Sequence, residues 1–147
     1  MSLIKCESLN EFFYEQIEKH GKFLSPTARF YVSELLSNLG NPQKLISHAL
    51  EEYTEKSLTL MLKDAVEAED RFKSFYLHRK LGDLCLVLGG IYKIPNVSDD
   101  LIIYLGEEGY RGASLYYPWK GFLSVYPELC EKFSMTMEAL RKLEIKI

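Results

Sequence analysis

Several common signals of function are missing from this chain of 147 residues. No block of five or more basic residues occurs, and the net charge is −3 at pH 7, which argues against binding to nucleic acid or to an anionic membrane surface. The three cysteines, Cys6, Cys85 and Cys130, show no C-x-x-C spacing. Their odd number and the lack of a signal segment at the amino terminus predict free thiols and a cytoplasmic protein.

Long apolar runs and strand patterns are also missing. The most apolar segment, Leu81–Tyr92, is about 12 residues long and contains Asp83, whereas a helix that spans a bilayer needs about 20 residues. No stretch shows the sustained polar–apolar alternation of a strand, and no Asn-Gly or Asp-Gly hairpin signal occurs. We therefore expect an all-α protein in which residues 81–92 form a buried central helix.

What the sequence does have is helical periodicity along nearly its whole length, with apolar residues three and four positions apart. Start signals precede the successive stripes at Ser8, Ser25-Pro26, Asn41-Pro42, Ser57 and Ser98, and Pro127 lies near the start of the last one. The pattern leaves open whether the helix after Ser57 continues without a break to Tyr92. We predict a single domain over residues 1–147, a bundle of six or seven helices around the central apolar helix.

The most informative residue is the carboxylate within the apolar segment. A buried carboxylate needs a partner or becomes protonated, and Arg79 lies one helical turn before Asp83 on the same face. Arg111 is a more distant candidate partner. The first interpretation is a structural ion pair, and the alternative is a site for an anion or a substrate. We treat Arg79, Asp83, Tyr110 and Arg111 as the candidate ligand-binding residues.

Three glycines, Gly106, Gly109 and Gly112, recur at intervals of three residues. They do not form a dinucleotide-binding fingerprint, because the G-x-G-x-x-G order is missing and no strand precedes them. Glycine destabilises a helix interior by ~1 kcal/mol relative to alanine. The spacing therefore predicts close packing against another backbone, with a ligand cradle as the alternative.

The sequence holds no pattern that predicts a metal site or a catalytic residue. The three histidines are His20, His48 and His78. The E-x-x-H motif of di-iron bundles requires a carboxylate three residues before the histidine, and none of the three has one. His48 precedes two glutamates by one turn, which is typical of a solvated helix face. His78 and Cys85 share a face, but no oxyanion signal accompanies them, so we interpret Cys85 as a core thiol. We expect no metal and no cofactor.

Two short motifs resemble those of a family of uncharacterised bacterial all-helical proteins. The first is Arg79-Lys-Leu-Gly-Asp83, followed by Leu86, Gly89 and Gly90, and the second is Tyr104-Leu-Gly106-x-x-Gly109-Tyr110. The family has alanine at the position of Gly109, a change that leaves close packing possible. The resemblance covers roughly the C-terminal half of the chain. It implies a bacterial origin and an all-helical fold, and it brings no function because the family has no assigned activity.

Two functional hypotheses follow. Aromatic residues make up 13% of the chain, which favours a non-enzymatic interaction or scaffold protein of the bacterial cytosol, forming a homodimer or binding a protein partner, with Trp119 as a candidate anchor. The alternative is a small-molecule-binding protein or enzyme with a pocket around Asp83 and Arg111. A flat exposed apolar patch would favour the first hypothesis, and a pocket of several hundred cubic ångströms beside the candidate residues would favour the second.

Overall fold

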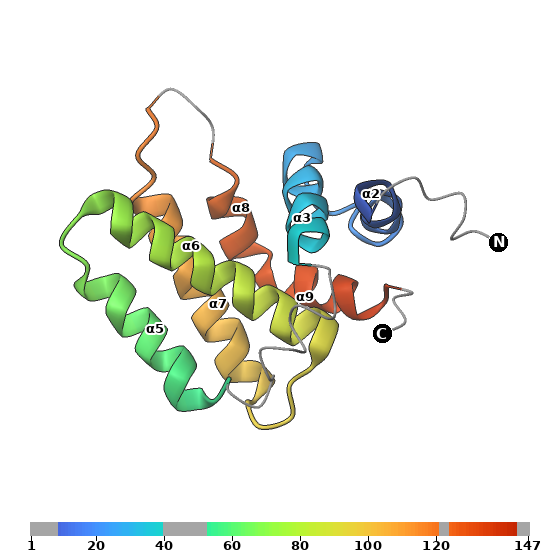
Figure 1. The fold of residues 1–147 in the computed structure, drawn as a ribbon. Helices are drawn as coiled ribbons and strands as arrows, with labels where there is room; N and C mark the ends of the chain where they lie inside the picture. The colour runs from blue at the N-terminus through green and yellow to red at the C-terminus, as the bar shows by residue number, and fades with distance from the viewer. Residues whose placement is uncertain (1–8, 40–52, 121–123, 144–147) are drawn as a thin grey trace.

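The computed structural model describes residues 9–39, 53–120 and 124–143 (Figure 1). These residues form seven α-helices and one π-helical turn and contain no strand, which confirms the predicted all-α bundle. The helices are α2 (Leu9–His20), α3 (Pro26–Leu39), α5 (Glu55–Glu67), α6 (Arg71–Val87), α7 (Asp99–Leu115), α8 (Tyr126–Glu131) and α9 (Phe133–Arg141), and the π-helical turn is η2 (Leu88–Tyr92). The start signals predicted at Ser8 and at Asn41-Pro42 lie outside the described residues.

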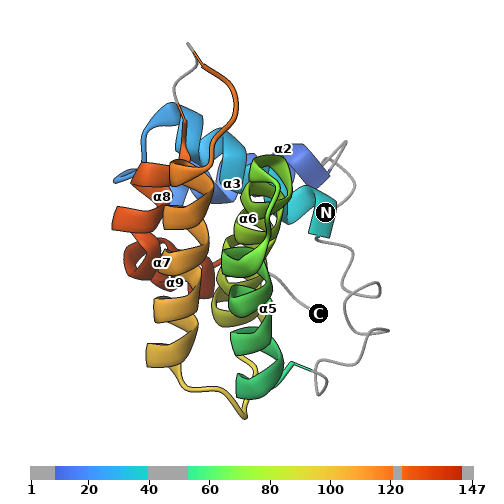
Figure 2. The same cartoon turned by 90° about the vertical axis from the view of Figure 1, so that its left-hand side faces the viewer.

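Helices α5, α6 and α7 run side by side and form the body of the bundle (Figures 1 and 2). The most extensive packing is between α6 and α7. Helices α2 and α3 pack against each other, and they contact the rest of the bundle through α9 and α6 respectively. Helix α6 therefore packs against α5 and α7, which also contact each other, and it contacts α3 as well.

The predicted central helix is the second half of α6 together with η2. From Leu81 to Gly90 every residue is buried except Asp83, which is partly exposed. The segment ends at Lys93, which has the left-handed φ of 49°. No helix in the described part of the chain combines the length and the apolar character needed to cross a bilayer.

Two predicted helix starts are confirmed. Pro26 is the first residue of α3, where its fixed φ is compatible with the helix and its missing N–H leaves no donor unpaired. Ser98 caps α7, because its hydroxyl accepts a hydrogen bond from the backbone N–H of Leu101 at 3.2 Å.

Two other boundaries differ from the sequence prediction. Helix α5 begins after Thr54, which forms a reciprocal capping box with Ser57, so Ser57 lies in the first turn and is not the cap. The sequence left open whether the helix after Ser57 continues to Tyr92, and the structure shows a break before Asp70, whose carboxylate accepts from the N–H of Phe72 and starts α6. The stripe after Ser57 therefore belongs to two helices, and the final stripe is likewise divided into α8 and α9, with Lys132 between them.

The three glycines of α7 are used for close packing, and the predicted contact with another backbone is found at Gly109. A Cβ atom at Gly109 would lie 2.5 Å from the backbone nitrogen of Gly82 on α6, so the two helices touch through their backbones. A Cβ at Gly106 would meet the ring of Phe133, and one at Gly112 would meet the ring of His78. Helix α7 is thus uninterrupted through these glycines, and the missing side chains let α6 pack closely on one side and α9 on another.

The start of α3 is fixed against α8 by hydrogen bonds. The backbone N–H and the hydroxyl of Ser25 donate to the two carboxylate oxygens of Glu128 at 2.7 and 2.6 Å. The ammonium group of Lys132 donates to the carbonyl oxygen of Phe23 at 2.8 Å. These contacts hold α3 in the position from which Tyr31 reaches the centre of the bundle.

Candidate functional site

Five polar side chains from four helices meet beside the middle of α6, and we call them the Asp83 cluster: Tyr31 from α3, Arg79 and Asp83 from α6, Tyr110 from α7 and Tyr126 from α8. The hydroxyl of Tyr110 donates to Oδ1 of Asp83 at 2.7 Å. The hydroxyl of Tyr31 donates to the same carboxylate, at 2.9 Å from Oδ1 and 3.1 Å from Oδ2. The Tyr126 hydroxyl interacts with Tyr31 and with the guanidinium of Arg79. The carboxylate is thus held by phenol donors from two other helices.

Aromatic packing fixes the positions of these hydroxyls. The ring of Tyr110 is fully buried and stacks on that of Tyr126, with centroids 6.0 Å apart and planes inclined by 24°. The ring of Tyr31 meets Tyr126 edge-on at 5.5 Å. Because the rings cannot turn freely in this packing, the hydroxyl groups stay directed at Asp83.

Burial dominates the electrostatics of the cluster. It raises the pKa of Asp83 from 3.8 to about 6, although the hydrogen bonds from Tyr110 and Tyr31 and the charge of Arg79 act in the opposite direction. Burial and the nearby Asp83 raise the pKa values of Tyr31 and Tyr110, so both phenols stay protonated and act as donors. Asp83 is the cluster member whose charge changes near neutral pH.

Arg79 is held over aromatic rings and has no ion-pair partner in contact among the described residues. Its guanidinium carbon lies 5.5 Å from the ring centroids of both Phe75 and Tyr76. No carboxylate in the described part of the chain comes within 4.0 Å of its nitrogen atoms, and Asp83 acts on it only through the longer-range field. Burial lowers the pKa of Arg79, but Tyr126, Tyr31 and Asp83 raise it overall, so the side chain is cationic.

The cluster borders a pocket of about 770 Å³ between α3, α5 and α6. Its walls combine aromatic, apolar and charged side chains: Tyr31, Glu34, Leu35, Asn38, Tyr53, Met61, Tyr76, Arg79, Lys80, Asp83 and Leu84. Tyr31, Arg79 and Asp83 are the cluster members that line it, whereas Tyr110 supports Asp83 from the α7 side. This size and this mixture of an apolar lining with a few polar groups are typical of small-molecule sites.

Three of the four predicted site residues come together, and one does not. Arg79, Asp83 and Tyr110 belong to the cluster. Arg111 instead forms an ion pair with Glu108 one turn earlier on α7, and its side chain is 60% exposed. The prediction that Arg111 could pair with Asp83 is therefore wrong, because the same helical turn that directs Tyr110 inward directs the next residue outward.

The expected burial of Asp83 needs a smaller correction. The segment around it is not closed on every side, because Asp83 is partly exposed where it lines the pocket. Its main partners are also phenols rather than an arginine. Tyr31 and Tyr126 were missed by sequence reasoning, since nothing in their local patterns distinguishes them from ordinary core tyrosines.

His78 and Cys85 are buried in the core of the bundle. Nδ1 of His78 donates to the carbonyl oxygen of Ser74 at 2.8 Å, and the imidazole stacks on Tyr116 with a centroid distance of 5.6 Å. Burial raises the pKa of Cys85 to about 12, so the thiol stays protonated and is a poor nucleophile. Within the described ranges no three His, Cys, Asp or Glu side chains are grouped as metal ligands, and His48 lies outside those ranges.

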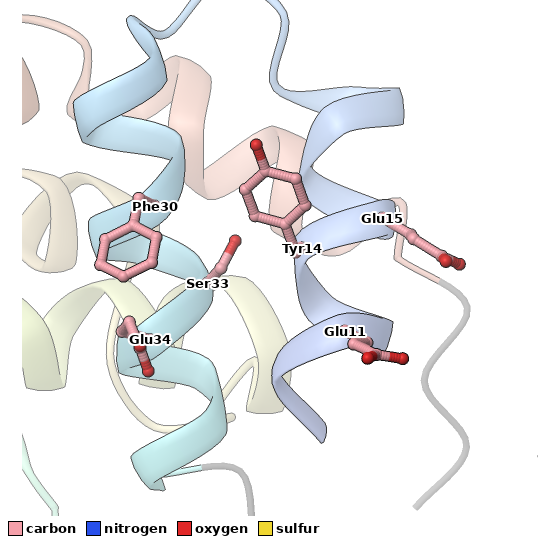
Figure 3. Close-up of a pocket in the computed structure, with 6 residues that line it drawn as sticks. All are labelled: Glu11, Tyr14, Glu15, Phe30, Ser33 and Glu34. Carbon is pink, nitrogen blue, oxygen red and sulfur yellow. The ribbon is translucent and has the colours of Figure 1, made fainter. Parts of the chain in front are cut away.

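A second hollow of about 480 Å³ lies between α2 and α3 and is shown in Figure 3. Its lining residues are Glu11, Tyr14, Glu15, Phe30, Ser33 and Glu34. Tyr14 extends from α2 towards α3, whereas Glu15 extends away from α3 and Glu11 lies over the first turns of α2 (Figure 3). The carboxylates therefore do not converge on a common point. Among the described residues, the lining of this hollow also contains no cationic side chain, whereas the pocket beside Asp83 is lined by Arg79 and Lys80.

The fold and the site together define an all-α bundle with a partly buried carboxylate–tyrosine cluster at the edge of a pocket. Comparison of the chain with models of known protein families, with curated proteins and with solved structures gives no match.

Proposed function

We propose that this protein binds a small organic molecule in the pocket beside the Asp83 cluster. The observation that carries the proposal is the opening of a polar cluster, built from four helices, onto a pocket of about 770 Å³. Many buried polar groups only join helices, but Tyr31, Arg79 and Asp83 also border open space. They can therefore orient a ligand while the apolar walls bury its surface.

The proposal can be tested with cinnamamide, a neutral planar probe with an apolar body and an amide group. We expect saturable backbone amide NMR shifts grouped on residues that line the pocket, such as Leu35, Met61 and Leu84. A Kd of a few millimolar is expected at about 0.3 kcal/mol per non-hydrogen atom. Shifts spread over the surface without saturation would contradict the proposal.

A blocking variant makes the test specific to the pocket. Asn38 is exposed at the pocket edge, so Asn38→Trp should fill the entrance without disturbing the core, and it is expected to weaken cinnamamide binding at least about tenfold. Thr27→Trp is the matched control, since Thr27 is exposed on the same helix and does not line the pocket. Equal binding by both variants would place the probe elsewhere.

A second candidate function is an interaction protein that forms a homodimer through an aromatic surface, as the sequence suggested. Trp119 and Phe72 are 49% and 59% exposed, and their rings meet edge-on at 6.4 Å. The inner side of Trp119 packs on the buried ring of Phe75 at 5.3 Å. A large aromatic side chain that is fixed on one side and exposed on the other favours an anchor in a protein interface.

The dimer hypothesis predicts a particle of twice the chain mass in light scattering at high protein concentration. Trp119→Ala should shift this particle towards the monomer, because an interface anchor contributes about 2 kcal/mol or more. Leu60→Ala is the control, since Leu60 is 45% exposed on α5. A particle of single-chain mass for the unmodified protein at all concentrations would end the hypothesis. A bacterial origin and a cytoplasmic location remain predictions of the sequence.

A further inference from the structure

We propose that the ligand of the pocket is an organic monoanion, a carboxylate carried on an apolar or aromatic body. This inference rests on the proposed small-molecule function and names the chemical class of the ligand. Its main support is the guanidinium of Arg79, which lines the pocket and has no carboxylate within 4.0 Å among the described residues.

The guanidinium of Arg79 would be stabilised by an anion bound in the pocket. Arg79 is only partly exposed, and partly buried charges are normally paired. Its planar guanidinium has five N–H donors, and among the described residues its hydrogen-bond partner is the hydroxyl of Tyr126, while Phe75 and Tyr76 contact it through their ring faces. The remaining donors match the two oxygens of a carboxylate, and Lys80 lies on the same wall of the pocket.

The carboxylates of the pocket limit the negative charge that a ligand can carry. Asp83 accepts two phenol hydrogen bonds, and Glu34 lines the opposite wall on α3. A second or third negative charge would therefore be repelled across the pocket. A monoanion fits this arrangement, whereas a phosphate monoester or a nucleotide does not.

The remaining lining supports the body of such a ligand. Leu35, Met61 and Leu84 supply an apolar surface from three helices, and Tyr53 and Tyr76 add aromatic rings. Flat hydrocarbon groups pack well against these side chains, and their burial provides affinity that does not depend on charge. The anionic group would thus set the orientation and the apolar body would add to the affinity.

The test compares three probes of equal size at pH 7.5: cinnamate, its neutral amide cinnamamide, and the dianion phenyl phosphate. Cinnamate is expected to bind at least tenfold more tightly than cinnamamide, which corresponds to ~1.4 kcal/mol. Phenyl phosphate is expected to bind no better than the amide. Amide NMR shifts locate each probe, and the preference for cinnamate should shrink as salt is added, because salt screens the charge.

Variants assign the preference to Arg79. Arg79→Gln should weaken cinnamate binding at least about tenfold, to the level of cinnamamide, and should weaken cinnamamide binding much less, because the amide carries no charge. Arg79→Lys keeps the charge without the planar fork and should retain an intermediate preference. Lys73→Gln is the control, since Lys73 is exposed on the same helix and does not line the pocket. Circular dichroism of each variant checks that the fold persists.

The outcomes separate this inference from the proposed function. Pocket binding of all three probes with equal affinity would overturn the monoanion assignment and leave small-molecule binding in place. Tightest binding by phenyl phosphate would overturn it in favour of a phosphorylated ligand. A cinnamate preference that survives in Arg79→Gln would remove Arg79 from the site, and the absence of saturable pocket binding by any probe would overturn both proposals.

Discussion

Replacing Gly109 by alanine is expected to lower the free energy of unfolding by about 3 kcal/mol, even though alanine is the better helix former. The new Cβ would lie 2.5 Å from the backbone nitrogen of Gly82 and 2.8 Å from the carbonyl oxygen of His78. Backbone atoms cannot rotate away as a side chain can, so α6 and α7 would have to separate. Urea unfolding followed by circular dichroism measures the loss.

The control for Gly109 is Ser114→Ala on the same helix, at a partly exposed position, which should change stability by less than about 0.5 kcal/mol. If Gly109→Ala proved as stable as this control, the backbone contact between the two helices would not exist as described. If it proved more stable than the unmodified protein, helix propensity would outweigh packing at this crossing.

The second large effect is expected at Asp83. Asp83→Leu should lower the free energy of unfolding by about 3 kcal/mol at pH 7, because the hydroxyls of Tyr31 and Tyr110 lose their common acceptor. Asp83→Asn keeps the shape and one acceptor oxygen, so it should cost less than about 1 kcal/mol at the same pH. Equal losses below about 0.5 kcal/mol for both variants, measured by urea titration, would show that the carboxylate is not held by the cluster.

The pH dependence of Asp83→Asn gives a sharper test. Burial raises the pKa of Asp83 from 3.8 to about 6, so between these pH values the folded protein binds more protons than the unfolded chain. The contribution of Asp83 to stability is therefore greatest at low pH and falls as pH rises through this window, by about 3 kcal/mol.

The quantity to measure is the difference in unfolding free energy between the unmodified protein and Asp83→Asn, because other titrating groups then cancel. This difference should fall between pH 4 and pH 6 and become constant above about pH 7. A difference that rises with pH would mean that the two phenols and Arg79 outweigh burial and that the pKa of Asp83 is lowered instead.

Local signals predicted much of the fold. Pro26 and Ser98 mark helix starts by chemistry that acts within one turn, and the glycine spacing of α7 indicated close packing before any partner was known. The predicted cap at Ser57 was wrong by three residues, because Thr54 and Ser57 together satisfy the exposed N–H groups of the first turn. The break before Asp70 could not be decided from the sequence, because apolar residues continue at helical spacing across it.

The candidate site was predicted only in part, for a reason of geometry. Arg79 and Asp83 lie one turn apart on one helix, so the sequence alone could place them side by side. Which other helices would reach them depends on crossing angles and on long-range packing. Tyr31, separated from Asp83 by 52 residues, could not be inferred in this way. Arg111 was chosen for its charge, but it lies on the outward-facing side of α7, where it pairs with Glu108 of the same helix.

The distribution of the Asp83 cluster along the chain also bears on the order in which the protein assembles. Tyr110 is 27 residues from Asp83 and belongs to α7, the helix that packs most extensively on α6. Tyr31 is 52 residues from Asp83 and belongs to α3, which packs on α6 much less. Closing the shorter loop loses less chain entropy, so we expect the α6–α7 pair to form before α3 arrives. Until then the Asp83 carboxylate lacks the hydrogen bond from Tyr31, and the pocket lacks the wall that α3 provides. A chain arrested at that stage would be largely helical and yet lack the pocket beside Asp83.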